Sequence, residues 1–164
     1  MIQTPCRIYF LRHGLADRAA YSGTDDRRRP LTPYGAARIE AGAATLARLD
    51  LDCGVILTSP LTRCRQTAAI TAAVLGLDDR LVVEPRLAPG FGLDDLEELV
   101  ADHGESGAIM LVGHEPDFSL TVSRLTGGSD LVFKKGGLAR VDIHPGAGPT
   151  GELVWLLPPR ILAL

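Results

Sequence analysis

The chain has 164 residues, 46% of them hydrophobic and 23% charged, which suits a single globular domain over residues 1–164. The formal net charge is −3 and charges of one sign form no long run, which argues against nucleic acid or an anionic membrane as the main partner. No apolar stretch is long enough to cross a membrane, and residues 1–5 lack the basic and apolar regions of a signal peptide.

Strand and helix patterns alternate along the chain, with short connections between them. The expected elements, in chain order, are a strand at 7–11, a helix at 33–49, a strand at 55–57, a helix at 60–76, a strand at 81–84, a helix at 93–102, a strand at 108–112, a helix at 116–125 and strands at 138–143 and 153–157. Thr32-Pro33 and Ser59-Pro60 each indicate an N-cap followed by proline at the first helical position. Residues 21–30 are polar and turn-prone, so we expect an exposed loop there.

This order of elements predicts an α/β protein with three layers, in which helices cover both faces of a mostly parallel central sheet. The wholly apolar strand at 108–112 is typical of the centre of such a sheet. Ligands bind at the carboxyl ends of the strands in these folds. The residues that follow the strands at 7–11, 55–57 and 108–112 should therefore meet at one edge of the sheet.

Two histidines and two arginines lie at these strand ends. A neutral His13 ring, fixed through one nitrogen, leaves the other nitrogen free to attack phosphorus. Gly14 permits the close approach of a ligand. Arg12 and Arg63 each offer a forked pair of donors to phosphate oxygens, and the first turn of a helix around Arg63 favours an anion. A protonated His114 can donate to an oxygen of the transferring group.

Each of these features alone has a simpler explanation. An arginine-histidine pair after a strand is more often structural, Ser59 before Pro60 is most simply an N-cap, and Gly-His-Glu-Pro can be a turn with an exposed histidine. Two strand-end histidines and two loop arginines at matching positions are not expected together by chance. The four residues together therefore support a phosphate site more strongly than any one of them does alone.

Other polar residues are expected to be structural or solvent-facing. The three cysteines are odd in number and lack zinc-ligand spacing, so reduced thiols in a cytoplasmic protein are expected. The cysteines are Cys6, Cys53 and Cys64; the residues expected in solvated turns, loops or surfaces are Asp25, Asp26, Arg27, Arg28, His103, Lys134, Lys135 and His144.

Four segments share one family resemblance. Residues 11–14 read Leu-Arg-His-Gly, residues 58–67 hold a serine-proline pair followed by arginine and a glutamine-threonine pair, and residues 112–115 read Val-Gly-His-Glu. In this order and spacing they resemble the three motifs of the histidine phosphatase superfamily, also called phosphoglycerate-mutase-like. Arg-Pro-Leu-Thr at 29–32 resembles the loop before the first helix in many members. The resemblance spans at least residues 7–126.

The resemblance implies that His13 is the nucleophile and that Arg12, Arg63 and His114 form the phosphate pocket, with Arg29 as a further candidate. The short chain resembles the SixA-type phosphohistidine phosphatases, which lack the long insertions that cover the site in mutases and phytases. An open site can admit a phosphohistidine on a protein surface. The expected partner is therefore a phosphorylated protein or a small phosphorylated molecule, with no cofactor and no metal.

Three alternatives stand for the proton donor to the leaving group. Many members place a glutamate between the second helix and the third motif, but Glu84, before Pro85, is expected to end a strand. Glu115 follows His114, where phytase-like members carry an acidic donor, and Asp17 is a further candidate. A site without a dedicated acid is the third alternative, because imidazole is a better leaving group than an alkoxide.

The resulting hypothesis is a metal-independent phosphatase that works in two steps through a phosphohistidine at His13. Protein phosphohistidine is the expected substrate, and small phosphoesters are the alternative. A mutase is a related alternative, but the short chain lacks room for the usual elaborations. Two alternatives come from other classes: a metallohydrolase with His13, His114 and Glu115 as ligands, and a non-catalytic phosphate-binding module.

Overall fold

The computed structural model describes residues 5–144, 146 and 148–163. Residues 1–4, on which most of the expectation of no signal peptide depends, lie outside the described residues. Within the described ranges, no helix is both long enough and apolar enough to cross a membrane.

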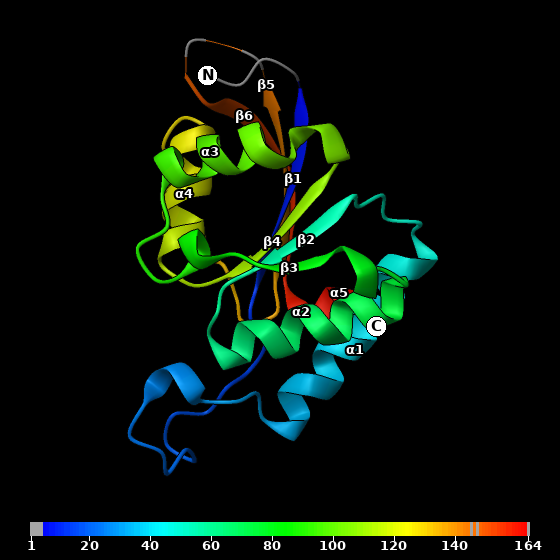
Figure 1. Cartoon of the computed structure of the whole chain (residues 1–164), viewed down its shortest axis with the longest axis vertical. Helices are drawn as coiled ribbons and strands as arrows, with labels where there is room; N and C mark the ends of the chain where they lie inside the picture. The colour runs from blue at the N-terminus through cyan, green and yellow to red at the C-terminus, as the bar shows by residue number, and fades with distance from the viewer. Residues whose placement is uncertain (1–4, 145, 147, 164) are drawn as a thin grey trace.

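Six strands form one sheet in the order β3-β2-β4-β1-β5-β6 (Figure 1). The strands are β1 (Cys6–Arg12), β2 (Val55–Thr58), β3 (Leu81–Val83), β4 (Ile109–Gly113), β5 (Leu138–His144) and β6 (Thr150–Leu157). The first four strands run parallel to one another, while β5 is antiparallel to both β1 and β6. Of these six, only β5 runs in the opposite direction, so the prediction of a mostly parallel sheet is confirmed.

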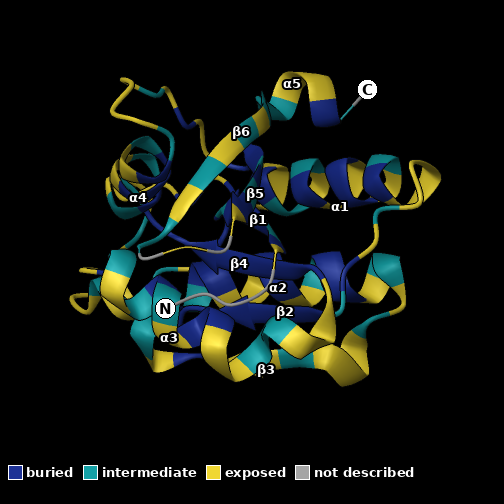
Figure 2. Cartoon of the chain, turned by 90° about the horizontal axis from the view of Figure 1, so that it is seen from above, coloured by how far each residue is buried: buried dark blue, intermediate teal, exposed yellow. Residues whose placement is uncertain are grey.

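Helices cover both faces of the sheet, as predicted. The helices are α1 (Pro33–Arg48), α2 (Thr62–Leu75), α3 (Leu93–His103), α4 (Asp117–Leu125) and α5 (Pro159–Leu162), with short 3-10 turns η1 (Asp26–Arg28), η2 (Asp78–Arg80), η3 (Pro85–Leu87) and η4 (Gly104–Ser106). Side chains of α3 and α4 pack on one face, and side chains of α1, α2 and α5 pack on the other. Figure 2 shows the buried residues gathered in the sheet and on the helix sides that face it. The molecule therefore has three layers.

Alternation along β1 explains why both faces need cover. Ile8 and Phe10 point into the cluster with α3 and α4, while Tyr9 and Leu11 point into the cluster with α1 and α2. Phe10 meets Phe118 of α4 edge to face, with ring centroids 5.2 Å apart. All five residues of β4 are buried, which confirms that the apolar run lies inside the sheet. A strand that is apolar on both sides is stable only between two helical layers.

Two local predictions need correction. The second helix begins at Thr62 rather than at Pro60, and its N-cap, Leu61, makes no side-chain cap bond. The loop at 21–30, which contains η1, is largely exposed as predicted, except that the side chain of Arg29 is only 11% exposed. Both departures have the same cause: side chains in these segments bond to residues far away in the sequence, as the site shows.

Candidate active site

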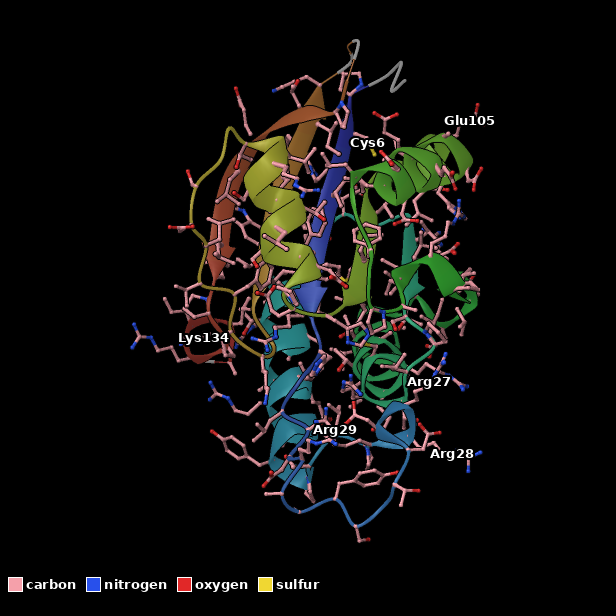
Figure 3. All side chains as sticks on the ribbon, turned by 90° about the vertical axis from the view of Figure 1, so that its left-hand side faces the viewer. Cys6, Arg27, Arg28, Arg29, Glu105 and Lys134 are labelled. Atoms are coloured by element: carbon pink, nitrogen blue, oxygen red, sulfur yellow. The ribbon has the colours of Figure 1, made fainter. Side chains whose placement is uncertain are left out.

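Three strand ends meet at one edge of the sheet. In the ladder between β1 and β4, Arg12 lies opposite Gly113, and the His13 amide continues the pairing by donating to the Gly113 carbonyl at 3.1 Å. The neighbouring ladder ends with Thr58 opposite Val112. The ring centroids of His13 and His114 are consequently 5.5 Å apart. Arg29 lies beyond the same ends of the strands in Figure 3, whereas Cys6 and Glu105 lie at the other end of the molecule.

The His13 ring is held in a defined chemical state. Its Nδ1 lies 2.8 Å from the carbonyl oxygen of Gly14, so Nδ1–H donates there and the lone pair resides on Nε2. Burial lowers the pKa of His13 to about 3, aided by the nearby charge of Arg63 and outweighing the bond to Gly14. The ring is therefore neutral at pH 7. The Nε of Arg63 donates to Nε2 at 3.3 Å, so the unprotonated nitrogen of the ring faces Arg63.

Backbone and hydroxyl groups fix the loop that carries His13. The Gly136 amide donates to the His13 carbonyl at 3.0 Å, and the Gly14 amide donates to Thr67 Oγ1 at 3.0 Å. Thr67 in turn donates to the Arg63 carbonyl at 2.7 Å, which ties the loop to α2. A Cβ at Gly14 would lie 2.8 Å from a side-chain carbon of Ile39, so this glycine is required by packing against α1. The sequence predicted that Gly14 lets a ligand come close, but the group that lies close to it is Ile39 of the protein itself.

Two arginines, Arg63 and Arg12, bring positive charge to His13. The Arg63 side chain is 7% exposed, and its second donor, NH1, donates to the backbone carbonyl of Asp26 at 3.0 Å. Arg12 donates from NH1 to the Phe133 carbonyl at 2.5 Å. Its Nε is buried and has no hydrogen-bond partner among the described residues. Burial lowers the pKa of both guanidinium groups, yet each stays charged and keeps donors for an anion.

His114 is neutral, contrary to the expectation of a protonated donor. Burial, followed by the charges of Arg63 and Arg12, lowers its pKa to about 4. The Oγ of Ser59 lies 2.8 Å from Nε2 of His114 and accepts from the Leu61 amide at 3.4 Å. A neutral imidazole keeps one N–H and can still donate through it. The expectation that Ser59 caps α2 is therefore wrong: it orients His114.

Asp26 was expected in a solvated loop and is instead part of the site. Its carboxylate accepts from Arg29 Nε at 2.8 Å and from Arg18 NH1 at 2.6 Å, and lies 3.4 Å from Arg63 NH1. The first of these contacts is the strongest cause that lowers the pKa of Asp26 to about 2. Arg29 also donates to the Ala16 carbonyl. The spacing of three residues between Asp26 and Arg29 within a tight turn is the sequence signal for this pair.

The three carboxylates considered as proton donors to the leaving group have different hydrogen-bond partners. Glu84 is paired through both oxygens with Arg86, whose bonds hold the pKa of that carboxyl below its usual range. Glu115 accepts from the Ser119 amide at 3.0 Å, at the start of α4. Asp17 accepts from the Ala19 amide at 2.8 Å in the exposed loop. Each carboxylate therefore has a local bond that accounts for its presence.

The lysine pair, His144 and the cysteines have the exposure that the sequence predicts. Lys134 and Lys135 are exposed at a turn, as expected, and His144 ends β5 beside the amino end of β1. Cys6, Cys53 and Cys64 are buried free thiols, as expected. Over the described ranges, no group of three or more histidine, cysteine, aspartate or glutamate side chains is arranged to hold a metal ion.

Comparisons with known proteins identify a family and a relative for this chain. Residues 8–92 match the family model described as histidine phosphatase superfamily (branch 1). An uncharacterized protein of Picosynechococcus sp. (strain PCC 7002) is 37% identical to this chain, over 94% of this chain and 98% of its own length.

The fold is also similar to solved structures. One is the protein histidine phosphatase SixA complexed with tungstate, with a TM-score of 0.84, 24% identity, and 95% of this chain and 99% of that chain covered. Another is a proposed phosphohistidine phosphatase SixA from Agrobacterium tumefaciens, with a TM-score of 0.75, 29% identity, and 93% and 97% of the two chains covered. A mycobacterial glucosyl-3-phosphoglycerate phosphatase shares the fold at a TM-score of 0.72 and 19% identity, over 91% and 98% of the two chains.

Proposed function

This chain belongs to the histidine phosphatase superfamily, and from that membership we propose that it hydrolyses phosphohistidine in proteins through a phosphorylated His13. One observation carries the proposal: His13 is neutral, its Nε2 lone pair is free of a proton, and that nitrogen faces Arg63 at 3.3 Å. A nucleophile needs this protonation state, and a purely binding site does not.

In the first step, Nε2 of His13 attacks the phosphorus atom. The new N–P bond forms as the bond from phosphorus to the substrate histidine breaks. The substrate ring, protonated on its other nitrogen, takes the electron pair and leaves as neutral imidazole, while Arg63 turns its Nε from His13 to a phosphoryl oxygen. Arg12 and the ring N–H of His114 hold the other oxygens, with Arg29 as a further donor. The carbonyl of Gly14 accepts from Nδ1–H and stabilises the positive charge that the ring acquires.

In the second step, water attacks the phosphorus of the phosphohistidine. The N–P bond breaks, the electron pair returns to Nε2 of His13, and inorganic phosphate leaves. The proposal includes no dedicated acid. Glu84 is held by Arg86, Glu115 by a helix amide, and Asp17 lies in the exposed loop. An imidazole leaving group needs less help from an acid than an alkoxide does.

The substrate class rests on the compact chain and on similarity to SixA structures. A site formed by three strand ends and one short loop suits a phosphorylated side chain presented on a protein surface. We place the protein in the cytoplasm because its three cysteines are buried free thiols. A phosphorylated protein, and not nucleic acid, is the proposed partner.

The test is phosphoenzyme trapping with a radiolabelled phosphohistidine protein. The wild type should give an acid-labile, base-stable phosphoenzyme, and His13→Ala should lose labelling and at least about a thousandfold in kcat/KM. His144→Ala is the matched control, because it removes an exposed histidine at the other end of the sheet, and it should behave as the wild type. Full labelling of His13→Ala would refute the nucleophile.

A panel of sugar phosphates and other small phosphoesters decides the substrate class. The phosphohistidine protein should have the highest kcat/KM. A small phosphoester that outcompetes it would make the chain a small-molecule phosphomonoesterase. Phosphate binding without hydrolysis of any compound would support the non-catalytic module.

A further inference from the structure

One of the protein's own carboxylates, that of Asp26, contacts arginines of the proposed phosphate pocket. Asp26 contacts Arg29 at 2.8 Å and Arg63 at 3.4 Å, and Arg18 contacts it from the solvent side at 2.6 Å. The Arg29 and Arg63 side chains are 11% and 7% exposed, whereas that of Asp26 is 36% exposed. In Figure 3, Arg29 points inward from this segment while Arg27 and Arg28 point to solvent.

The charges of the pocket set what it can hold. Arg12, Arg29 and Arg63 bring three positive charges, and His13 and His114 bring none, because burial keeps both rings neutral. The Asp26 carboxylate, which Arg18 also contacts, offsets part of this positive charge at Arg29 and Arg63.

We propose that Asp26 is a specificity-determining residue that lowers the charge of the pocket, so that inorganic phosphate is bound weakly and leaves after each turnover. The inference rests on the proposed function, because it concerns the product of that reaction. It goes beyond that function by assigning a role to a residue that donates nothing to the substrate.

Asp26 acts through its charge rather than as the sole anchor of the arginines. Arg63 is also held by the backbone carbonyl of Asp26, and Arg29 by the carbonyl of Ala16. Asparagine at this position keeps an oxygen that accepts from Arg29 Nε. Asp26→Asn therefore removes the negative charge while it leaves both side chains anchored. An anion that enters the pocket is then no longer repelled by a carboxylate in contact with the same guanidinium groups.

Asp25 supplies a matched control. It lies in the same turn, its Oδ1 accepts from the Arg27 amide at 3.0 Å, and its ion pair is with Arg28, whose side chain is 83% exposed. Asp25→Asn makes the same chemical change in the same loop and keeps the amide bond. It removes no charge from a pocket arginine.

The experiment measures the binding of inorganic phosphate by isothermal titration calorimetry. Asp26→Asn should bind phosphate about tenfold more tightly than the wild type, since a partly exposed unit charge near a dianion acts through a dielectric close to that of water. Asp26→Glu should stay near the wild-type affinity, and Asp25→Asn within about twofold. The difference should shrink as salt rises. Unchanged or weaker binding in Asp26→Asn would overturn the inference and make Asp26 a purely structural anchor.

Kinetics separate this inference from the proposed function. With a phosphohistidine protein, Asp26→Asn should show a lower KM, stronger inhibition by phosphate and no gain in kcat. The binding measurement needs no turnover, so tighter phosphate in Asp26→Asn supports the inference even if no phosphohistidine is hydrolysed. Absence of hydrolysis would overturn the proposed function alone. Absence of phosphate binding by both the wild type and Asp26→Asn would overturn the inference alone.

Discussion

Burial of His13 and His114 predicts that the folded state loses stability as the pH falls below about 6.5. The two side chains are 6% and 4% exposed, and their pKa values in the folded state are lowered to about 3 and about 4. In the unfolded chain both rings titrate near 6.5. Between these values the unfolded state binds more protons than the native state, so acid favours unfolding.

The size of the effect at pH 5 depends mainly on the unfolded chain. A ring that stays neutral in the native state but is protonated in the unfolded state costs about 2 kcal/mol between pH 7 and pH 5. Together His13 and His114 should lower the free energy of unfolding by about 4 kcal/mol, a large part of the usual 5–15 kcal/mol of a small domain.

Urea unfolding at pH 7, 6 and 5 tests this prediction. His13→Asn keeps a side-chain amide near the position of Nδ1 and removes one titrating group, so it should lose only about 2 kcal/mol over the same range. His144→Asn, at a side chain that is 50% exposed, should follow the wild type. Equal pH slopes for His13→Asn and the wild type would show that His13 is not held neutral in the folded state.

Three further predictions follow from the site. Ser59→Ala removes the hydroxyl that holds the His114 ring through Nε2, so kcat should fall roughly tenfold with little change in KM; an unchanged kcat in steady-state assays would contradict this role. Thr67→Val leaves the buried amide of Gly14 without its partner and should cost about 1–3 kcal/mol in urea unfolding, and a loss below about 0.5 kcal/mol would count against that bond. Thorough treatment with EDTA should leave turnover unchanged, whereas activity that is lost and returns with added zinc would favour the metallohydrolase.

Features that depend on neighbours in the sequence were predictable. The apolar run of β4 predicts a buried central strand, and every one of its residues is buried. Thr32 before Pro33 predicts the start of α1, and Thr32 Oγ1 accepts from the Gly35 amide at 2.9 Å. The strand-end rule brings Arg12, His13 and His114 to one edge because parallel strands end together. These predictions need only periodicity, local capping and the direction of the strands.

Features that depend on contacts across the fold could not be predicted from the sequence. Ser59-Pro60 carries the same local signal as Thr32-Pro33, but Ser59 is 55 residues from His114 in sequence and bonds to it instead. Asp26 lies in a charged, polar segment that resembles any solvated loop, and only the fold brings Arg63 to it. The neutral state of His114 likewise results from burial by several elements together. No short window of sequence contains these partners.

The position of β1 between β4 and β5 also determines when the pocket can form during synthesis. The proposed nucleophile His13 is made early, yet the carbonyl that receives its amide belongs to Gly113 and the amide that fixes its own carbonyl belongs to Gly136. The Arg12 side chain likewise donates to the carbonyl of Phe133. A nascent chain still lacking β5 therefore carries His13 on an unsupported loop. Most of the chain must be synthesised before Arg12 and His13 gain these partners, so an incomplete chain lacks the assembled pocket.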